Sequence, residues 1–272
     1  MKMSSAWIIY KHNKLIARLH AKIYKHFKIG SSYKSLYGLK NLEQGKPCFV
    51  IANGPSLEIK DLNLLDRNNV VTIGSNKIYR CFDQTRWRPK YFTVADYLNA
   101  ENDNREIDEL SMTKFIPYSL KSFFKNKDDV FYFNELSAKI DTSSKYVPTF
   151  SSDATEGFHV GHTVTHLNIQ IAVFLGCNPI YIIGMDGSYK TPQTKVSHDV
   201  MESVIVSDHR NHFVKDYYTD GEKWAMPRTD LIEIEHDLDN QAVLSKGRKI
   251  YNASRRSAIK SFERISMSDI KF

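Results

Sequence analysis

The chain has 272 residues, of which 42% are hydrophobic, 25% charged and 12% aromatic, a composition typical of a soluble globular protein. This composition excludes disordered, collagen-like and disulfide-stapled chains. The three cysteines, Cys48, Cys81 and Cys177, are too few and too scattered for a framework of bridges or a CxxC metal site. No stretch approaches the roughly 18 uncharged apolar residues of a spanning helix. We therefore expect a cytoplasmic protein with neither a membrane span nor a secretion signal.

The net charge of +7 is concentrated near the N-terminus. Residues 1–46 hold ten Lys and Arg and one acid, Glu43, whereas the remainder holds 28 basic and 30 acidic residues. Between Ala6 and Lys28, apolar residues recur at helical spacing among lysines and one arginine, which predicts a basic amphipathic helix in a leader of residues 1–45.

Such a helix suits an anionic membrane surface, and equally well a place on the protein body with its basic face in solvent. In the first case the protein lies at the inner face of the membrane. We expect no nucleic-acid partner, because the basic stretch does not continue into the body and no nucleic-acid-binding motif is present. In either case we expect the leader to be separate from the functional pocket.

From Pro47 onward, short apolar runs alternate with helical stretches, which predicts one α/β domain over residues 46–272 with a doubly wound, mainly parallel, Rossmann-like sheet. The runs are Phe49–Ala52, Val70–Ile73, Tyr91–Ala95, Lys114–Ile116, Val130–Phe133, Ile180–Ile183 and Lys249–Tyr251. The longest helix of this domain is expected over Thr163–Leu175, closed by Gly176.

Polar residues follow five of these strands. They are Asn53 with Gly54, Ser75 with Asn76, Asp96, Gly184 with Asp186, and Asn252. A single polar residue after a strand is ordinary turn chemistry, but ligands of open parallel sheets bind outside the carboxyl ends of the strands. Five such positions together predict one binding site.

The segment from Phe49 to Leu57 is the best-defined motif, a buried strand that breaks at Gly54-Pro55. We expect Ser56 to cap the following helix and Gly54 to permit close approach of a phosphate, so that added bulk at Gly54 blocks it. The segment is neither a GxGxxG fingerprint nor a P-loop, so nucleotide binding and a plain strand-to-helix turn both remain open.

Several motifs resemble a known family. They are Asn53–Leu57 (NGPSL), Gly161–Thr165 (GHTVT), Ile183–Asp186 (IGMD), Asn211–Phe213 with Asp216–Tyr217, and Gly247–Ser254. Over about residues 46–270 the chain resembles the domain shared by archaeal 6-hydroxymethylpterin pyrophosphokinases and many proteins of bacterial surface-polysaccharide loci. That domain is similar in fold to bacterial lipooligosaccharide sialyltransferases and flagellin nonulosonic-acid transferases. Arg255-Arg256-Ser257 departs from the glycine-rich turn of this pattern.

The sialyltransferase resemblance implies a CMP-activated sugar as donor and a glycan as acceptor. It places Asn53, Gly54, Pro55 and Ser56 near the phosphate, Asn76 near the donor, Thr163 at the sugar or phosphate, and Asn252 and Ser254 at the nucleotide. Asp96, Gly184 and Asp186 complete the predicted donor site at the strand ends.

The same resemblance assigns the general base to His212, which follows the stretch Lys190–Ser207 within a predicted mobile loop of about residues 187–220. His209 is the alternative base, and Asp208 or Asp216 is expected to orient the imidazole. Tyr189 and Tyr217 are the expected donors to the leaving phosphate.

No metal site is expected. His162 and His166 are spaced i, i+4, but they lack the glutamate of an HExxH motif and a third ligand. We therefore interpret His162 as a residue at the edge of the pocket and His166 as structural. The only Asp-x-Asp, Asp237-Leu-Asp239, falls in a helical stretch, which favours a reaction without metal or other cofactor.

These features predict a metal-independent, inverting glycosyltransferase that moves a sialic-acid-like (nonulosonic) or similar sugar from CMP to a surface glycan. One alternative is an ATP- and Mg²⁺-dependent pyrophosphokinase of a pterin-like alcohol, in which Asp96 and Asp186 at adjacent strand ends would hold the ion. Another is a non-catalytic scaffold that binds a nucleotide sugar.

Overall fold

An eight-stranded parallel sheet forms the centre of the computed structural model, which describes residues 5–27, 31–125, 127–190, 195–197, 202–205, 211–225 and 227–272. The strand order is β15-β14-β10-β1-β2-β3-β4-β5, and every neighbouring pair is parallel. The strands are β1 (Cys48–Ile51), β2 (Val71–Ser75), β3 (Tyr91–Thr93), β4 (Thr113–Pro117), β5 (Val130–Phe133), β10 (Ile180–Ile183), β14 (Ile250–Asn252) and β15 (Glu263–Arg264). The predicted Rossmann-like α/β fold is thus confirmed.

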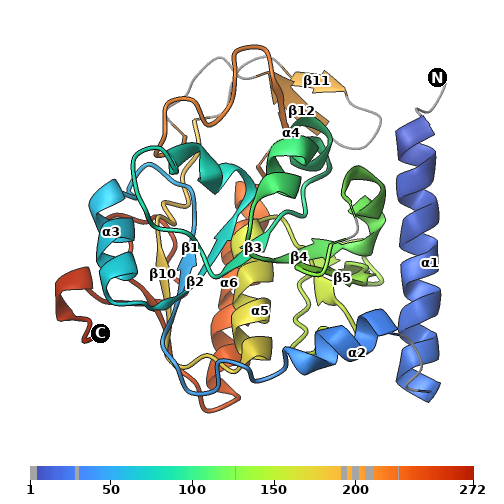
Figure 1. Ribbon diagram of the computed structural model, residues 1–272, viewed down its shortest axis with the longest axis horizontal. Helices are drawn as coiled ribbons and strands as arrows, with labels where there is room; N and C mark the ends of the chain where they lie inside the picture. The colour runs from blue at the N-terminus through green and yellow to red at the C-terminus, as the bar shows by residue number, and fades with distance from the viewer. Residues whose placement is uncertain are drawn as a thin grey trace.

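Helices cover both faces of the sheet (Figure 1). They are α1 (Ser5–Phe27), α2 (Ser31–Gly38), α3 (Ile59–Arg67), α4 (Tyr97–Glu109), α5 (Val164–Leu175) and α6 (Thr229–Leu244). Side chains of β1 alternate between the faces: Cys48 and Val50 pack in the cluster with α5 and α6, and Phe49 and Ile51 in the cluster with α3 and α4. Burial on both faces explains why β1 is an uninterrupted apolar run.

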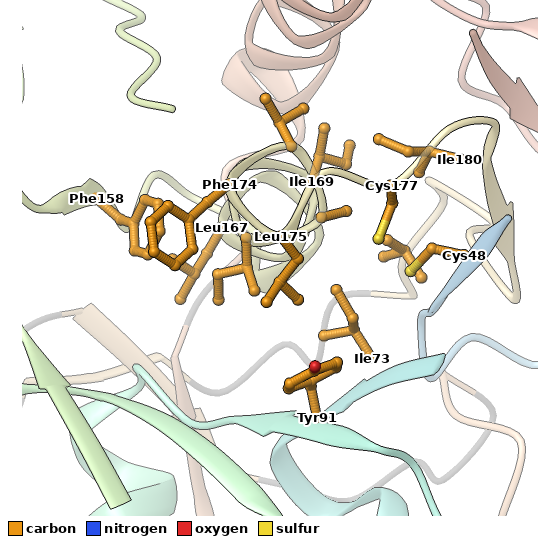
Figure 2. Close-up of a cluster of buried hydrophobic side chains, with 14 of the residues drawn as sticks. Cys48, Ile73, Tyr91, Phe158, Leu167, Ile169, Phe174, Leu175, Cys177 and Ile180 are labelled. Carbon is orange, nitrogen blue, oxygen red and sulfur yellow. The ribbon is translucent and has the colours of Figure 1, made fainter. Parts of the chain in front are cut away.

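Helix α5 is the central helix of the first cluster, where its apolar side chains meet those of the sheet (Figure 2). It begins after Thr163, whose hydroxyl accepts a hydrogen bond from the backbone N–H of Thr165, and it ends at Gly176 in the left-handed conformation (φ 91°). These are the predicted limits of the helix. Nearly every residue of α5 is buried, so the helix is apolar all round rather than amphipathic.

The predicted N-terminal helix is α1, which lies beside the β5 edge of the sheet (Figure 1). Trp7 and Tyr10 stack on each other and meet the ring of Tyr97 edge-on, and Ala17 and Ala21 are buried. This helix therefore packs on the body along one face. Within the described ranges, no helix combines the length and the apolar character that crossing a membrane requires.

Short elements complete the structure. They are the two-stranded sheets β6 (Glu135–Leu136) with β9 (Phe158–His159) and β7 (Lys139–Ile140) with β8 (Tyr146–Val147), the antiparallel sheet β11 (Lys195–Ser197), β12 (Glu202–Ile205) and β13 (Lys223–Ala225), and the 3₁₀ helices η1 (Asn76–Cys81), η2 (Tyr118–Phe123) and η3 (Met267–Asp269). The segment 187–220, predicted as a loop, thus contains β11 and β12, whereas residues 191–194, 198–201 and 206–210, with His209, lie outside the described residues.

Candidate active site

A pocket of about 650 Å³ opens at the carboxyl ends of β10, β1, β2 and β3. Its volume is that of a site for a nucleotide-sized ligand, and its place is where open parallel sheets bind ligands. The candidate residues in its lining are Asn53, Gly54, Pro55, Asn76, Asp96, Thr163, Gly184, Asp186, Tyr189, His212 and Tyr217. The fold therefore brings most of the predicted site residues into one pocket, while their roles stay predictions.

Two asparagines at the strand ends, Asn53 and Asn76, line this pocket. Asn53 donates from Nδ2 to the carbonyl oxygen of Ser75 (3.2 Å). This hydrogen bond orients the amide group and leaves Oδ1 as its acceptor. Asn53 Oδ1 and Asn76 Oδ1 are both buried and find no donor among the described residues. Because buried polar atoms are normally paired, these two oxygens are places where a ligand's N–H or O–H would bind.

The turn after β1, at Gly54, is hydrogen-bonded to the turn after β10. The N–H of Gly54 donates to the carbonyl oxygen of Gly184 (2.9 Å). A Cβ at Gly54 would lie 2.3 Å from Asp186 Oδ2 and 2.5 Å from Gly184 O. Added bulk at Gly54 would therefore meet protein atoms, which is a reason for the glycine that the sequence did not show, and close approach of a phosphate stays a prediction.

Ser56, Asn252 and Ser254 are not among the residues that line the pocket. The predicted cap role of Ser56 is wrong, since α3 is capped by Glu58 in a reciprocal box with Asp61. Asn252 Oδ1 accepts from the N–H of Ser254 (3.0 Å), and Ser254 Oγ accepts from the N–H of Met185 (2.9 Å). In the described structure these two residues support the pocket wall from behind.

Asp96 and Asp186, the acids that the pyrophosphokinase alternative assigns to Mg²⁺, both line the pocket, but the predicted adjacency of their strands is wrong. Strands β1 and β2 lie between β10 and β3, so Asp186 and Asp96 do not follow adjacent strands. Asp186 accepts from the N–H of Ser56 (2.9 Å) and from Arg256 Nε (2.8 Å). Asp96 caps α4 by accepting from the N–H of Asn99 (2.8 Å), and burial, opposed by backbone hydrogen bonds, raises its pKa.

An aromatic cluster of His212, Tyr217, Tyr218 and Trp224 forms one wall. The His212 ring stacks on Tyr217 with 3.9 Å between centroids and 4° between planes, and it meets Tyr218 and Trp224 edge-on. Burial raises the pKa of Tyr217, so its hydroxyl keeps its proton at neutral pH. Burial, with the nearby charge of Asp186, also raises the pKa of Tyr189.

A layer of histidines and carboxylates forms a second wall, where the segment before α5 meets α6. Glu235 is fully buried and accepts from the backbone N–H of His162, from Nδ1 of its ring and from the hydroxyl of Tyr146. Asp239, also fully buried, accepts from Nδ1 of His166 (2.7 Å) and of His236 (2.9 Å).

His166 is structural, as expected, with both ring nitrogens hydrogen-bonded and 1% of the side chain exposed. His162, His236 and Tyr146 line the pocket. From the sequence, Glu235 was missed and Asp239 was considered only as part of an Asp-x-Asp metal motif. Among the described residues, no three His, Cys, Asp or Glu side chains are grouped so that they would hold a metal ion.

Helix α1 contributes two residues to the pocket lining, Tyr10 and Lys14. Both bond to Glu135, Tyr10 through its hydroxyl (3.3 Å) and Lys14 through Nζ, and Glu135 also accepts from Ser119 Oγ (3.0 Å). The expectation that the leader is separate from the pocket was therefore wrong. The helix carries part of the site wall on its inner face.

The fold and the pocket define a doubly wound α/β protein whose strand-end loops line one pocket. The family model described as 6-hydroxymethylpterin diphosphokinase MptE-like matches residues 21–192, and the chain belongs to this MptE-like family. The family resemblance inferred from the motifs is thus confirmed. A comparison with curated protein sequences found no match.

Among solved structures, the chain is similar to the MAf glycosyltransferase from Magnetospirillum magneticum AMB-1, with a TM-score of 0.50 and 16% identity. The match covers 89% of this chain and 39% of that one, so the chain spans well under half the length of the larger protein. The chain therefore has a glycosyltransferase-like fold.

Proposed function

We propose that this protein is a glycosyltransferase that moves a nonulosonic acid or a similar sugar from a CMP-activated donor to a glycan. The observation that carries the proposal is the pair of buried, unpartnered oxygens Asn53 Oδ1 and Asn76 Oδ1 in the strand-end pocket. Ribose hydroxyls and the amino group of cytosine are donors that suit such acceptors. The N-terminal end of α5, at Thr163, lines the same pocket and suits a phosphate.

In the proposed reaction the acceptor oxygen attacks the anomeric carbon as the bond from that carbon to the CMP phosphate breaks. The configuration inverts, CMP leaves with the electron pair, and the acceptor proton passes to a base in the pocket. The family resemblance predicts His212 for this role. The hydroxyls of Tyr189 and Tyr217, which keep their protons, would donate to the departing phosphate without a metal ion.

A nucleotide panel tests the proposal by thermal unfolding, since a ligand that binds only the folded state raises the melting temperature. CMP or CDP without metal should raise it, whereas UDP, GDP, ADP and ATP should raise it less. A rise that needs ATP with Mg²⁺ would instead support the pyrophosphokinase for which the family is described. If the protein binds CMP but releases no CMP from CMP-sugars, the result would support the alternative of a non-catalytic scaffold that binds a nucleotide sugar.

Asn76→Gly should weaken CMP binding about tenfold, because it removes one acceptor oxygen and about 1.4 kcal/mol of binding. Asn76 has a φ of 52°, a conformation that glycine adopts freely, so the backbone of the turn is retained. Asn41→Gly is the matched control, since Asn41 has a φ of 59° and is exposed in the segment after α2. Equal CMP affinity of Asn76→Gly and the parent would contradict the role of this oxygen.

The proposal includes attachment to an anionic membrane surface at the inner face of the membrane. Ile8, Leu15, Leu19 and Ile23 are exposed by 55%, 65%, 57% and 37% on α1, and their spacing places them on one side of the helix. Trp7, Tyr10, Ala17 and Ala21 pack on the body. Helix α1 has lysines and an arginine but no acid, so this outer face complements anionic lipid.

Leu15→Ser with Leu19→Ser should reduce binding to vesicles of anionic lipid at least about tenfold, because two leucines lose their burial in the headgroup layer. Flotation with the full chain measures it. The matched control is Leu42→Ser with Leu244→Ser, which replaces leucines exposed by 51% and 53% elsewhere on the surface. If both double variants bind vesicles like the parent, the membrane proposal is wrong.

A further inference from the structure

The pair His162–Glu235 has the geometry of an oriented proton acceptor. Glu235 comes from α6 and is fully buried, yet its carboxylate lies beside the ring of a residue that lines the pocket. Both carboxylate oxygens accept from the backbone N–H of His162 (3.0 Å each), and Oε1 also accepts from Nδ1 of its ring (2.9 Å). Two anchor points on one residue fix where this imidazole lies.

These contacts also determine which ring nitrogen is basic. Burial alone would raise the pKa of Glu235, but the hydrogen bond from His162, the charge of His166 and the hydroxyl of Tyr146 lower it, so the carboxylate is ionised. An ionised carboxylate only accepts, so Nδ1 of His162 carries the hydrogen. Nε2 of the neutral ring then holds the lone pair, in a side chain that is 27% exposed.

The surrounding residues hold this arrangement in place. The Tyr146 ring meets the His162 ring edge-on at 4.7 Å between centroids, and its hydroxyl donates to the same carboxylate. Gly161 has a φ of 65°, and a Cβ there would lie 2.6 Å from the ring of His166 and 2.9 Å from Glu235 Oε1. A glycine at this position lets the backbone approach the carboxylate of Glu235 closely. The close approach, as well as the positive φ, explains why the residue is a glycine.

We propose that His162, oriented by Glu235, is the general base that takes the proton of the acceptor hydroxyl, in place of His212. The assignment rests on the proposed glycosyl transfer. The proton passes from the acceptor oxygen to Nε2 as that oxygen bonds to the anomeric carbon and CMP departs with the electrons of the broken bond. Glu235 stays ionised and stabilises the imidazolium that forms, so it is a positioning residue. The stacked ring of His212 belongs to the aromatic cluster, which suits contact with a planar part of the ligand.

The test measures CMP release from a CMP-activated nonulosonic acid with a panel of mono- and disaccharide acceptors. His162→Gln keeps an N–H donor for Glu235 but cannot take up a proton, so it should lower kcat about 10²- to 10⁴-fold. Its thermal stabilisation by CMP should match that of the parent, which separates chemistry from folding and binding. His212→Ala, which removes a pocket histidine outside the pair, should cost less in kcat.

In Glu235→Gln, the pH dependence of kcat/KM distinguishes an effect on the base from a purely structural role of Glu235, because a structural role would not shift this profile. Without the carboxylate charge the imidazolium is less stable, so the acid limb of the kcat/KM profile should shift to lower pH. If His162→Gln keeps full turnover and His212→Ala loses it, the assignment of His162 as the base is wrong, while the proposed glycosyltransferase activity is retained. A parent protein that binds no CMP and releases none from the donor would overturn the assignment together with the proposed function.

Discussion

Asp239→Asn should lower the free energy of unfolding by about 3–5 kcal/mol, the usual cost of removing one partner from a buried ion pair. His166 donates from Nδ1 to Asp239 (2.7 Å) and from Nε2 to the carbonyl oxygen of Thr149 (3.2 Å). Since both acceptors lack a hydrogen to give, both ring nitrogens carry one, and His166 is an imidazolium. Its side chain is 1% exposed and that of Asp239 is fully buried, so water cannot replace the lost charge.

Denaturant unfolding of the full chain measures this loss. Asp237→Asn is the matched control, because Asp237 is exposed on the same helix two residues away. It should change the free energy of unfolding by less than about 0.5 kcal/mol. Equal stability of the two variants would show that the ion pair of His166 and Asp239 contributes nothing to folding.

The stability difference between the parent and Asp239→Asn should also depend on pH. Burial alone would lower the pKa of His166, but the charge and hydrogen bond of Asp239 raise it above its ordinary 6.5. Burial alone would raise the pKa of Asp239, but the charge and hydrogen bond of His166, aided by His236, lower it below 3.8.

The raised pKa of His166 stabilises the folded protein below pH 6.5, and this contribution is lost as the pH rises through the pKa of His166 in the folded protein. The lowered pKa of Asp239 stabilises the folded protein above pH 3.8, and this contribution is lost as the pH falls through the pKa of Asp239 in the folded protein. The difference between the two proteins should therefore be largest between about pH 4 and 6.5. Melting temperatures across pH 3–9 measure it. A difference that grows from pH 7 to 9 would contradict the charged state of His166.

Local sequence signals were enough to predict most of the fold. Each of the seven apolar runs is a strand of the central sheet, and Thr163 and Gly176 bound α5 as their capping chemistry predicts. Strand β15 (Glu263–Arg264) was missed, because two exposed charged residues at a sheet edge lack any apolar pattern. The helix α1 was predicted, but the spacing of its apolar residues did not show that it has one face on the body and another in solvent.

The site was less predictable, because its decisive contacts join distant parts of the chain. Strand order decides that Asp96 and Asp186 are not neighbours, and no local pattern encodes that order. The bond between His162 and Glu235 spans 73 residues. One signal was available in α6, where acids and a histidine occupy the helical spacing of the apolar residues, in the order Ile232, Glu235, His236, Asp239 and Val243. Ionisable residues on the inner face of a helix indicate buried partners, and here the partners of Glu235, His162 and Tyr146, line the pocket.

Gly54→Val should lower the free energy of unfolding by about 3 kcal/mol and abolish nucleotide binding, because the turn cannot accept a side chain. The Cβ would lie 2.3 Å from Asp186 Oδ2 and 2.5 Å from Gly184 O, and both positions are fixed. Asp186 is held by Arg256 and by the N–H of Ser56, and Gly184 O accepts from the N–H of Gly54 itself. Relief of the clash therefore breaks the contacts that join the ends of β1 and β10.

Chemical unfolding and CMP-dependent thermal shift measure the two effects of Gly54→Val separately. Gly38→Val is the matched control, since a Cβ at Gly38, the last residue of α2, meets nothing within 4 Å. It should cost less than about 1 kcal/mol and leave CMP binding unchanged. If Gly54→Val is as stable as the parent and binds CMP as tightly, the strand-end turn can accommodate a side chain. In that case the close contact of Gly54 with Asp186 and Gly184 would not explain the glycine, and the turn would not be a rigid wall of the proposed nucleotide site.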